Sequence, residues 1–475
     1  MLFCSISFMA FFAVLLCIYW SLPWQRARVW LLVAASFYFY ATWNKWLAVI
    51  LCISTVADYI LALGIEKAQT SGRRKLMLCI SLFANLGLLC YFKYTNFFLL
   101  SLDEVLIAAG SSSWFRSLQV IVPIGISFYT FEAINYMVDV YRGRMKAERN
   151  FGDFLLFILF FPHLVSGPIV RARDFLPQIK RPKRCDWVRL HLGLQYFLMG
   201  LFKKLAIADR MAQFADPVFD HALDYQTPAA WIALFAYAMQ VYCDFSGYTD
   251  MAIGTAHMLG YKLAENFNMP YLAANISELW NRWHISLSSW LREYIFIPLG
   301  GSRGGEWKTR RNLIITMTLC GLWHGAACQF VGFGFLQAWL LIAHRAFHRW
   351  CKYKPQIDGV LRSWLGTMFR VAFTFSCFCL SLVVFRSSSF GQAFDMYTRL
   401  LTPASDALPA PVPVFGFWLT AGVMLAGHLF GRSGVWIRPA LRLPAPMIGF
   451  SYAVLFGLAL LLEPQGAKPF IYFQF

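Results

Sequence analysis

The sequence has little charge and few of the short motifs that mark soluble enzymes. Charged residues make up 14% of the 475 residues and hydrophobic residues make up 59%, whereas a soluble domain usually has about 25% charged residues. The mean hydropathy is +0.54. Apolar runs of about 17–25 residues, long enough to cross a bilayer core of about 30 Å, recur along the chain. This composition excludes a string of soluble domains and predicts an all-α polytopic membrane protein.

Several common catalytic and metal-binding motifs are absent. The sequence contains no GxSxG nucleophile elbow, no GxxxxGK[ST] phosphate loop and no GxGxxG dinucleotide motif. No histidine is followed five residues later by aspartate, so the HxxxxD arrangement of soluble glycerolipid-type acyltransferases is missing as well. The twelve cysteines form no CxxC pair, which predicts neither a metal nor a disulfide framework. His344 and His348 have the i, i+4 spacing of metal ligands but lack the HExxH glutamate, so we expect no metal site.

The chain is strongly basic, with 42 Lys and Arg residues against 24 Asp and Glu residues and a formal charge of +18. These basic residues gather in short loops between apolar runs, as expected of cytoplasmic loops, and we expect no nucleic-acid partner. Binding of an anionic ligand on the cytoplasmic face remains open as a second use of this charge. The alternation predicts about eleven spans in a single membrane-embedded domain, residues 1–475, with both termini outside the cytoplasm.

Some segments are too short or too polar to span a membrane. The stretch "FPHLVSGPIVR" is broken by Pro162, Gly167 and Pro168, and "WNRWHISLSSWLREYIFIPLGG" has no clean lipid face. Interrupted helices persist in membranes only where neighbouring protein or a water-filled cavity satisfies the exposed backbone. We therefore expect re-entrant and interfacial helices in addition to the spans.

Three acidic residues, Glu132, Asp244 and Asp250, lie in otherwise apolar sequence. They can pair with Lys or Arg at helix ends, or they can form part of an ion path. An ion-coupled transporter or flippase of an acyl or glycan intermediate is therefore an alternative function, because such carriers use intramembrane acids and broken helices. The absence of an inverted repeat in the hydropathy counts against this alternative.

His324, in "GLWHGA", is the strongest candidate for catalysis. It is the only Asp, Glu, Lys, Arg or His between Asn312 and Ile342, and such a group at membrane depth is costly and therefore usually functional. A neutral imidazole bonded to a helix carbonyl is the structural alternative. Gly321 and Gly325 favour function, because they let another backbone or a thin substrate approach the ring closely.

His284, in "WNRWHISLSSW", is the second candidate, with Arg282 and Arg292 near enough in sequence to suggest ion pairing. A structural histidine in an interfacial helix is the alternative. If His284 and His324 converge, one can act as general base while the other orients or donates. His163, in the broken segment, is better explained by packing or pore lining.

Two further features could serve substrates. The loop "GGSRGG" with Arg303, Lys308, Arg310 and Arg311 can hold a phosphate through backbone N–H groups and positive charge. The chain ends on "FIYFQF", an aromatic tail with one phenol, Tyr472. This tail can pack against apolar helices, or it can insert into a slot and present the phenol.

Taken together, these segments resemble the membrane-bound O-acyltransferase family, in particular its bacterial alginate and peptidoglycan O-acetylation type. The resemblance covers nearly the whole chain, and its motifs occur in the expected order: "PIGISFYTFEAINYMVDVYRG", "FPHLVSGPIVR", "YCDFSGYTDMAIG", "ENFNMPY", "WNRWHISLSSWLREYIFIPLGG", "GLWHGA" and "FIYFQF". One small departure is Asn281, where arginine is more frequent.

The resemblance implies a ring of spanning helices around a thinned centre with a cytoplasmic funnel. It implies that His324 is the catalytic residue and His284 the second functional histidine. It further implies a bacterial inner-membrane enzyme that takes acetyl from acetyl-CoA, with no permanently bound cofactor. The acetyl group would pass to an extracytoplasmic polysaccharide, with peptidoglycan favoured and alginate or another exopolysaccharide possible, through an SGNH-type partner. In the similar teichoic-acid D-alanylation system a tyrosine in a C-terminal aromatic motif is thought to carry the acyl group, which suggests Tyr472 as a relay.

Overall fold

The computed structural model of the chain is all-helical and describes residues 1–112, 118, 123, 125–165, 167–433, 443–464 and 469–471. The chain divides into two compact units, each described by itself below. Unit 1 comprises Met1–Phe197 and Thr249–Ala264, and unit 2 comprises Leu198–Tyr248 and Glu265–Phe475. The predicted relay residue Tyr472 lies outside the described residues.

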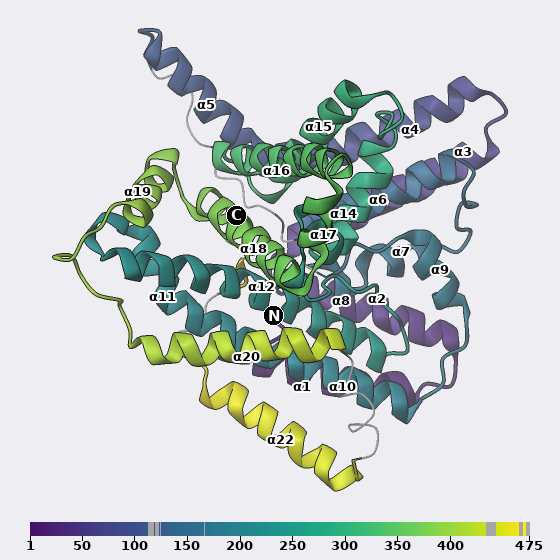
Figure 1. Cartoon of the computed structure of the whole chain (residues 1–475). Helices are drawn as coiled ribbons and strands as arrows, with labels where there is room; N and C mark the ends of the chain where they lie inside the picture. The colour runs from purple at the N-terminus through teal and green to yellow at the C-terminus, as the bar shows by residue number, and fades with distance from the viewer. Residues whose placement is uncertain are drawn as a thin grey trace. The chain divides into compact units, whose positions relative to one another are not determined.

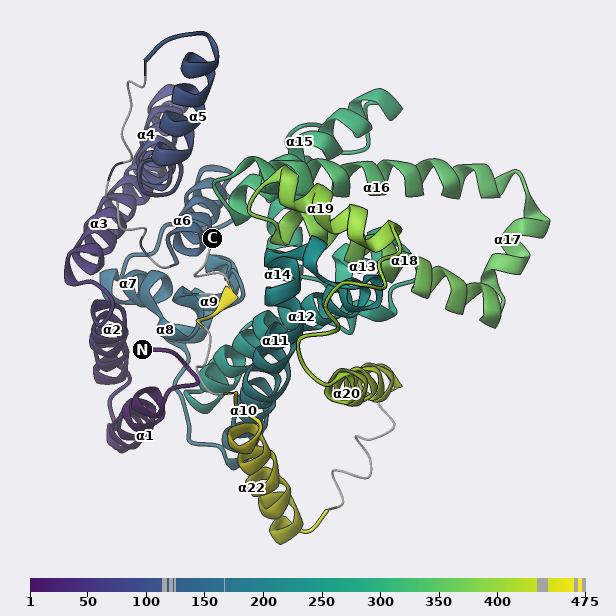
Figure 2. The same ribbon diagram turned by 90° about the vertical axis from the view of Figure 1, so that its left-hand side faces the viewer.

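Unit 1 contains most of the N-terminal helices (Figure 1). They are α1 Ile6–Ser21, α2 Gln25–Ala41, α3 Lys45–Lys67, α4 Ser71–Leu89, the π-helical turn η1 Cys90–Tyr94, α5 Thr95–Ala108, α6 Ile126–Tyr141, α7 Phe151–Leu159, α8 Phe161–Leu164, α9 Ala172–Lys180 and most of α10 Trp187–Phe202. Helices α3 and α4 lie side by side (Figures 1 and 2). The break between α7 and α8 confirms the interruption that Pro162 predicts.

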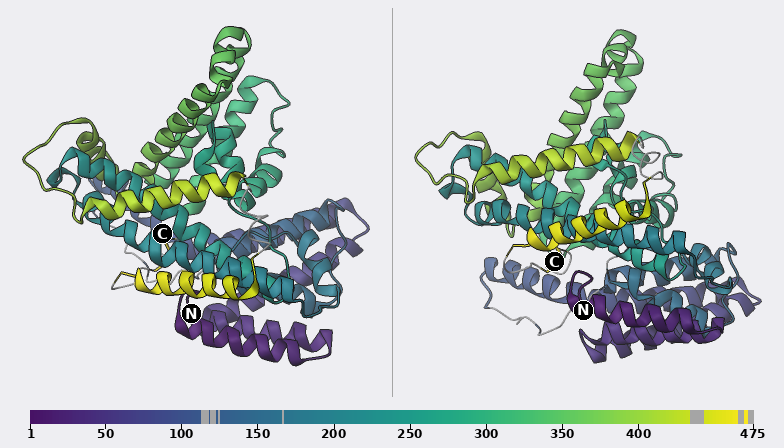
Figure 3. Two further views of the ribbon diagram at one scale, coloured as in Figure 1. Left: turned by 60° about the horizontal axis from the view of Figure 1, so that its bottom comes forward. Right: turned by 90° about the horizontal axis from the view of Figure 1, so that it is seen from below.

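Unit 2 contains the C-terminal helices and most of the long helix α12. They are η2 Lys203–Ala208, α11 Asp209–Asp220, η3 Ala222–Asp224, α12 Thr227–Met258, η4 Pro270–Leu272, α13 Ile276–Arg282, α14 Ile285–Leu291, η5 Arg292–Phe296, α15 Glu306–His324, α16 Cys328–Lys352, α17 Pro355–Arg362, α18 Trp364–Arg386, α19 Phe390–Leu401, α20 Val414–Ser433 and α22 Ala445–Leu461. The α16–α17–α18 path reverses direction (Figure 2), and α20 and α22 are each straight (Figure 3).

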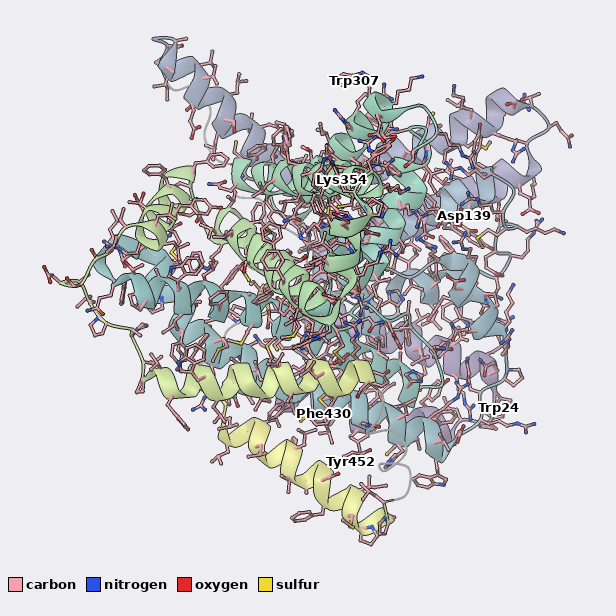
Figure 4. The ribbon with its side chains drawn as sticks, viewed as in Figure 1. Trp24, Asp139, Trp307, Lys354, Phe430 and Tyr452 are labelled. Carbon is pink, nitrogen blue, oxygen red and sulfur yellow. The ribbon has the colours of Figure 1, made fainter. Side chains whose placement is uncertain are left out.

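Five helical segments among the described residues are long and apolar enough to cross a membrane: Lys45–Lys67, Ser71–Ala108, Cys328–Lys352, Trp364–Arg386 and Val414–Ser433. Helices α1 and α22 are apolar but shorter. Trp307 and Phe430 illustrate the many large apolar side chains exposed outside the core (Figure 4), as expected of surfaces that lipid covers. The chain is therefore a multi-pass membrane protein, although these segments do not establish the predicted number of eleven spans.

The apolar stretch 312–342 forms a helical hairpin. Helix α15 ends at His324, the chain turns at Gly325–Ala327, and α16 runs back beside it. A Cβ atom at Gly321 would collide with the carbonyl oxygen of Phe330, and one at Gly334 would collide with that of Met317. Small residues allow two backbones to approach in this way. The space that Gly321 leaves is thus filled by α16, and the ring of Phe330 covers Gly325.

The close approach of α15 and α16 predicts that Gly334→Ala destabilises the protein by about 1–3 kcal/mol, because the added methyl group meets backbone that cannot move aside. The matched control is Gly422→Ala in α20, where nothing lies within 4 Å of the added atom and where alanine favours the helix. The thermal unfolding midpoint in detergent checks both variants. Equal midpoints for the two would contradict the packing described here.

Candidate active site

His284 and His324 converge in unit 2, which is the condition for a shared site. Their ring centroids are 6.5 Å apart at an interplanar angle of 60°. The side chains are buried, with exposed fractions of 0% for His284 and 5% for His324. A ring nitrogen makes hydrogen bonds over a distance of about 2.9 Å. One substrate atom placed between the two rings can therefore contact both of them. The pair can therefore share the work of a general base and its orienting partner.

Aromatic side chains surround both imidazoles. Phe245 of α12 meets the His284 ring edge to face at 4.6 Å, and Trp323 lies 5.7 Å from the same ring. Phe385 of α18 meets the His324 ring at 5.4 Å, and the sulfur of Cys320, one turn earlier in α15, lies 3.9 Å from His324 Nε2. This apolar shell keeps water away, so any hydrogen bond to a reacting group acts at a low local dielectric.

His284 has an unusual backbone. Its φ of 44° lies in the left-handed region, and Met269 is the only other non-glycine residue with positive φ in the described part of the chain. Such a conformation costs about 1–3 kcal/mol and persists only where the surroundings hold it. Asn266 contacts the His284 ring, with its Oδ1 atom 3.1 Å from Nδ1. The strained backbone makes His284 a candidate for a functional role on a ground separate from the family resemblance.

Of the charged residues near His284 in sequence, Arg282 pairs with Glu278 at 2.9 Å and donates to the backbone oxygen of Asn268. His284 lies between α13 and α14, outside the candidate membrane spans. Burial holds the pKa of its imidazole well below the usual range, and the nearby His324 ring adds to this effect. His284 is therefore neutral at pH 7.

A buried charge cluster lies on neighbouring elements of unit 2. Lys204 Nζ lies 2.8 Å from Asp209 Oδ1 and 2.7 Å from Asp244 Oδ1, and all three side chains are at most 6% exposed. Of the two alternatives for Asp244, pairing with a cation is the one observed. The other oxygen, Asp244 Oδ2, accepts a hydrogen bond of 2.7 Å from the backbone N–H of Ile471.

The start of the C-terminal tail is therefore held beside the site. The Phe470 ring stacks on Tyr248 at 4.7 Å and lies 5.9 Å from Phe245, which in turn contacts His284. Phe470 and Ile471 are both buried. Because a buried carboxylate, a backbone amide and two aromatic rings hold these residues, residues 470–471 are anchored within the protein rather than left on its surface.

The predicted phosphate-binding residues stand at the opposite end of α15 from His324. Arg310 lies 3.9 Å from Glu306, and Arg311 donates to Asn312 Oδ1 at 3.1 Å. The amide of Asn312 donates in turn to the carbonyl oxygens of Leu299 and Gly301, and so fixes the glycine-rich loop.

The side chain of Lys308 lies against Gly304, and the backbone N–H of Arg303 donates to Gly300. The four side chains thus belong to one loop and the first turns of α15, but they do not converge on a single point.

Sequence reasoning missed two arginines of this basic region. Arg345 and Arg349 of α16 both pair with Glu306, which therefore meets three arginines when Arg310 is included. They lie 39 and 43 residues after Glu306, so only the hairpin of α15 and α16 brings them together. Asn266 and Lys204 were also missed, because each gains its role through a tertiary contact that no local pattern reveals.

His163 and Glu132, both in unit 1, form a separate buried pair with Nδ1 and Oε1 3.0 Å apart. Glu132 Oε1 also accepts from the backbone N–H of Val170 at 2.9 Å. The side chain of Asn135 donates to the backbone oxygen of Val170. This agrees with the packing role expected of His163. It also ties Glu132, one of the acids that a carrier would need, into a structural contact.

Comparison with known proteins assigns the class. Residues 145–387 match the model of the membrane-bound O-acyltransferase family. A probable alginate O-acetylase of Azotobacter vinelandii is 40% identical over 395 residues, which cover 82% of this chain and 76% of the relative. The peptidoglycan O-acetyltransferase of Helicobacter pylori is 38% identical over 396 residues, which cover 78% of this chain and 72% of the relative.

A more distant relative is the teichoic acid D-alanyltransferase of Bacillus subtilis. It is 28% identical over 285 residues, which cover 56% of this chain and 69% of the relative. The chain belongs to the membrane-bound O-acyltransferase family, and it is an acyltransferase. The alternative of an ion-coupled carrier is set aside on this finding.

The buried charge cluster predicts that Lys204→Met destabilises the protein by about 3–5 kcal/mol, because it leaves Asp209 and Asp244 buried without their cation. The control is Arg362→Met in α17, whose pair with Asp358 is exposed and therefore contributes less than about 1 kcal/mol. Thermal unfolding in detergent compares the two variants. If Lys204→Met unfolds at the wild-type midpoint, the cluster does not stabilise the fold.

Proposed function

We propose that this protein transfers an acetyl group from cytoplasmic acetyl-CoA, across the inner membrane of a bacterium, for O-acetylation of an extracytoplasmic polysaccharide. The observation that carries the proposal is the approach of two buried imidazoles, His284 and His324, in a chain of an O-acyltransferase family. The whole chain, residues 1–475, acts as one catalytic domain with both termini outside. No permanently bound cofactor is needed, because the donor itself brings the acyl group.

His324 is the general base of the proposed reaction. Its imidazole takes the proton of an attacking hydroxyl, whose oxygen forms a bond to the thioester carbonyl carbon. The carbon–sulfur bond then breaks, and the leaving CoA thiolate recovers the proton from the imidazolium. His284 lies close enough to accept a hydrogen bond from the N–H of His324 and so to orient the base. The aromatic shell supports this role, because excluding water protects the acyl group from hydrolysis.

The donor enters at the basic end of α15. This helix has 19 residues and is therefore roughly 28 Å long, with His324 at one end and the region of Arg303, Lys308, Arg310 and Arg311 at the other. Acetyl-CoA has a matching design, since a long, thin pantetheine arm separates its phosphates from its thioester. The three arginines around Glu306 supply more positive charge than that carboxylate neutralises, which favours phosphate binding.

The first acyl acceptor is Tyr472. In the sequence it follows Ile471, whose backbone amide is bonded to Asp244 in the same unit as both histidines. A phenol loses its proton far more readily than an alkyl alcohol, so an O-acetyl-tyrosine is a good acyl donor in turn. A partner of the SGNH type would take the acetyl group onto its serine and pass it to a polysaccharide hydroxyl. Direct transfer to the partner serine is the alternative.

Peptidoglycan is the acceptor polymer that we propose first, and alginate is the second. Relatives named for each of the two polymers are nearly equally similar to this chain, at 38% and 40% identity. Mass spectrometry of isolated peptidoglycan and of secreted polysaccharide, from cells with and without this protein, measures both. If both polymers keep their acetyl esters in cells without this protein, the assignment to glycan O-acetylation is overturned.

The proposed mechanism predicts that His324→Ala lowers acetyl-CoA-dependent CoA release by about 10²–10⁴-fold, the usual contribution of a general base. The matched control is His221→Ala, a histidine of the same unit whose side chain is exposed, and it should retain wild-type turnover. Purified protein in detergent is assayed for free thiol. Turnover by His324→Ala at the control rate would remove His324 from the chemistry.

The relay predicts that Tyr472→Phe abolishes polysaccharide O-acetylation in cells, because the ring is kept while the acyl-accepting oxygen is lost. Alkaline release of acetate from the isolated polymer provides the measurement. Full O-acetylation with Tyr472→Phe, alongside its loss with His324→Ala, would retain the catalytic base and exclude the relay.

The donor site predicts a separate kinetic effect. The double variant Arg345→Ala, Arg349→Ala should raise the KM for acetyl-CoA by about tenfold, since charge-assisted hydrogen bonds contribute about 1.5–3 kcal/mol, while kcat changes little. Arg362→Ala on α17 is the control for loss of basic charge. A fall in kcat at unchanged KM would contradict donor binding at the α15–α16 arginines.

A further inference from the structure

The first turn of α14 lacks the usual side-chain cap of its own. The first backbone N–H groups of a helix have no partner within the helix, and Ser, Thr, Asp or Asn at the N-cap commonly accepts from them. His284 occupies this position and makes no capping hydrogen bond with its side chain. The N–H groups at the start of α14 therefore need acceptors from another part of the chain.

Asn266, 18 residues before His284, supplies these acceptors. Its backbone oxygen accepts from the N–H of Ile285 at 2.9 Å. Its side-chain Oδ1 accepts from the N–H of Ser286 at 3.1 Å and from the Ser286 hydroxyl at 2.9 Å. Both N–H groups belong to the first turn of α14, so one residue caps the helix with its backbone and its side chain. Because these bonds are made by the two residues that follow His284, they also hold its backbone.

The same oxygen sets the protonation of the His284 ring. A backbone N–H can only donate, so the Asn266 atom bonded to Ser286 N–H is the carbonyl oxygen and not the amide nitrogen. His284 Nδ1 lies 3.1 Å from that oxygen and must therefore carry the hydrogen. A neutral imidazole has one N–H, which leaves the lone pair on Nε2. His284 then has a single accepting nitrogen.

Several rings pack around His284. Phe245, Trp323, Phe267 and His324 lie 4.6, 5.7, 6.5 and 6.5 Å from its ring. His324 is the titratable group of these four, and Asn266 is the polar group whose bond to Nδ1 decides the tautomer.

We propose that Asn266 is a positioning residue for acyl transfer, which holds the His284 backbone and commits the ring to donate from Nδ1 and to accept at Nε2. The inference rests on the proposed function. Nε2 of His284 is then the atom that accepts a hydrogen bond from the N–H of His324, whose other ring nitrogen takes the proton of the attacking hydroxyl. The His284 ring cannot turn its own N–H toward the reacting atoms. Without Asn266 both tautomers are available, and only a fraction of the molecules carries the accepting nitrogen.

Two substitutions separate this role from simple structural support. Asn266→Asp keeps an oxygen for Nδ1–H and for the Ser286 N–H, but it adds a negative charge that stabilises the imidazolium. The pKa of His284 should rise, so the acid limb of the kcat profile should move to higher pH by one unit or more, while turnover on the alkaline side is kept within about threefold. Asn266→Ala should lower kcat by 10–100-fold with the KM for acetyl-CoA unchanged.

The matched controls are Asn268→Asp and Asn268→Ala. Asn268 is two residues away, its side chain is exposed, and it contacts Arg282 only through its backbone N–H and its backbone oxygen. Its variants should keep the wild-type pH profile and kcat. The assay is acetyl transfer from acetyl-CoA to a model phenol by the full-length protein in detergent, over pH 5–9.

A pH profile of Asn266→Asp that coincides with those of wild type and Asn268→Asp would overturn the proposal. So would loss of folded, monodisperse protein for both Asn266 variants, because it would assign the residue to folding alone. If His324→Ala is inactive while Asn266→Ala is fully active, only this inference fails. If His324→Ala is active, the proposed function itself fails.

Discussion

A helix that stops inside a membrane protein must find partners for the amide and carbonyl groups that it no longer satisfies, and both candidate catalytic residues lie at such places. His324 is the last residue of α15, and His284 stands directly before α14. Beside His284 a side-chain amide serves the interrupted backbone, since Asn266 accepts from the start of α14. At the end of α15 away from His324, Asn312 donates to two carbonyl oxygens of the preceding loop. Both candidate residues thus lie where helices end.

The sequence was informative where the signal is local. Long apolar runs of the sequence form helices α3, α18 and α20, which are long and apolar enough to cross a membrane. Proline and polar residues correctly located the broken segments around α8 and α13–α14. His324 and His284 stood out because ionisable groups in apolar sequence are costly. Whether the two converge could not be read from the sequence, and the geometry of unit 2 shows that they do.

Local signals failed for contacts made across long separations. The sequence offered several charged residues near His284 without showing how they pair, and Arg282 pairs with Glu278, four residues before it in α13. Asn266 carried no signal because an asparagine in a loop has many uses, and Arg345 and Arg349 reach Glu306 only after α15 and α16 pack together. The glycines were recognised as places of close approach, but composition alone could not tell a neighbouring helix from a substrate.

The anchoring of residues 470 and 471 also bears on how a second molecule could use the same place. A segment tethered to its own binding site is present there at an effective concentration in the millimolar range for a short flexible linker. Any peptide supplied by another protein would have to exceed this local supply to displace Phe470 and Ile471 from Asp244 and Tyr248. Covalent continuity therefore makes the chain its own preferred ligand, and a competitor would need either an additional contact elsewhere or release of the tail before it could enter.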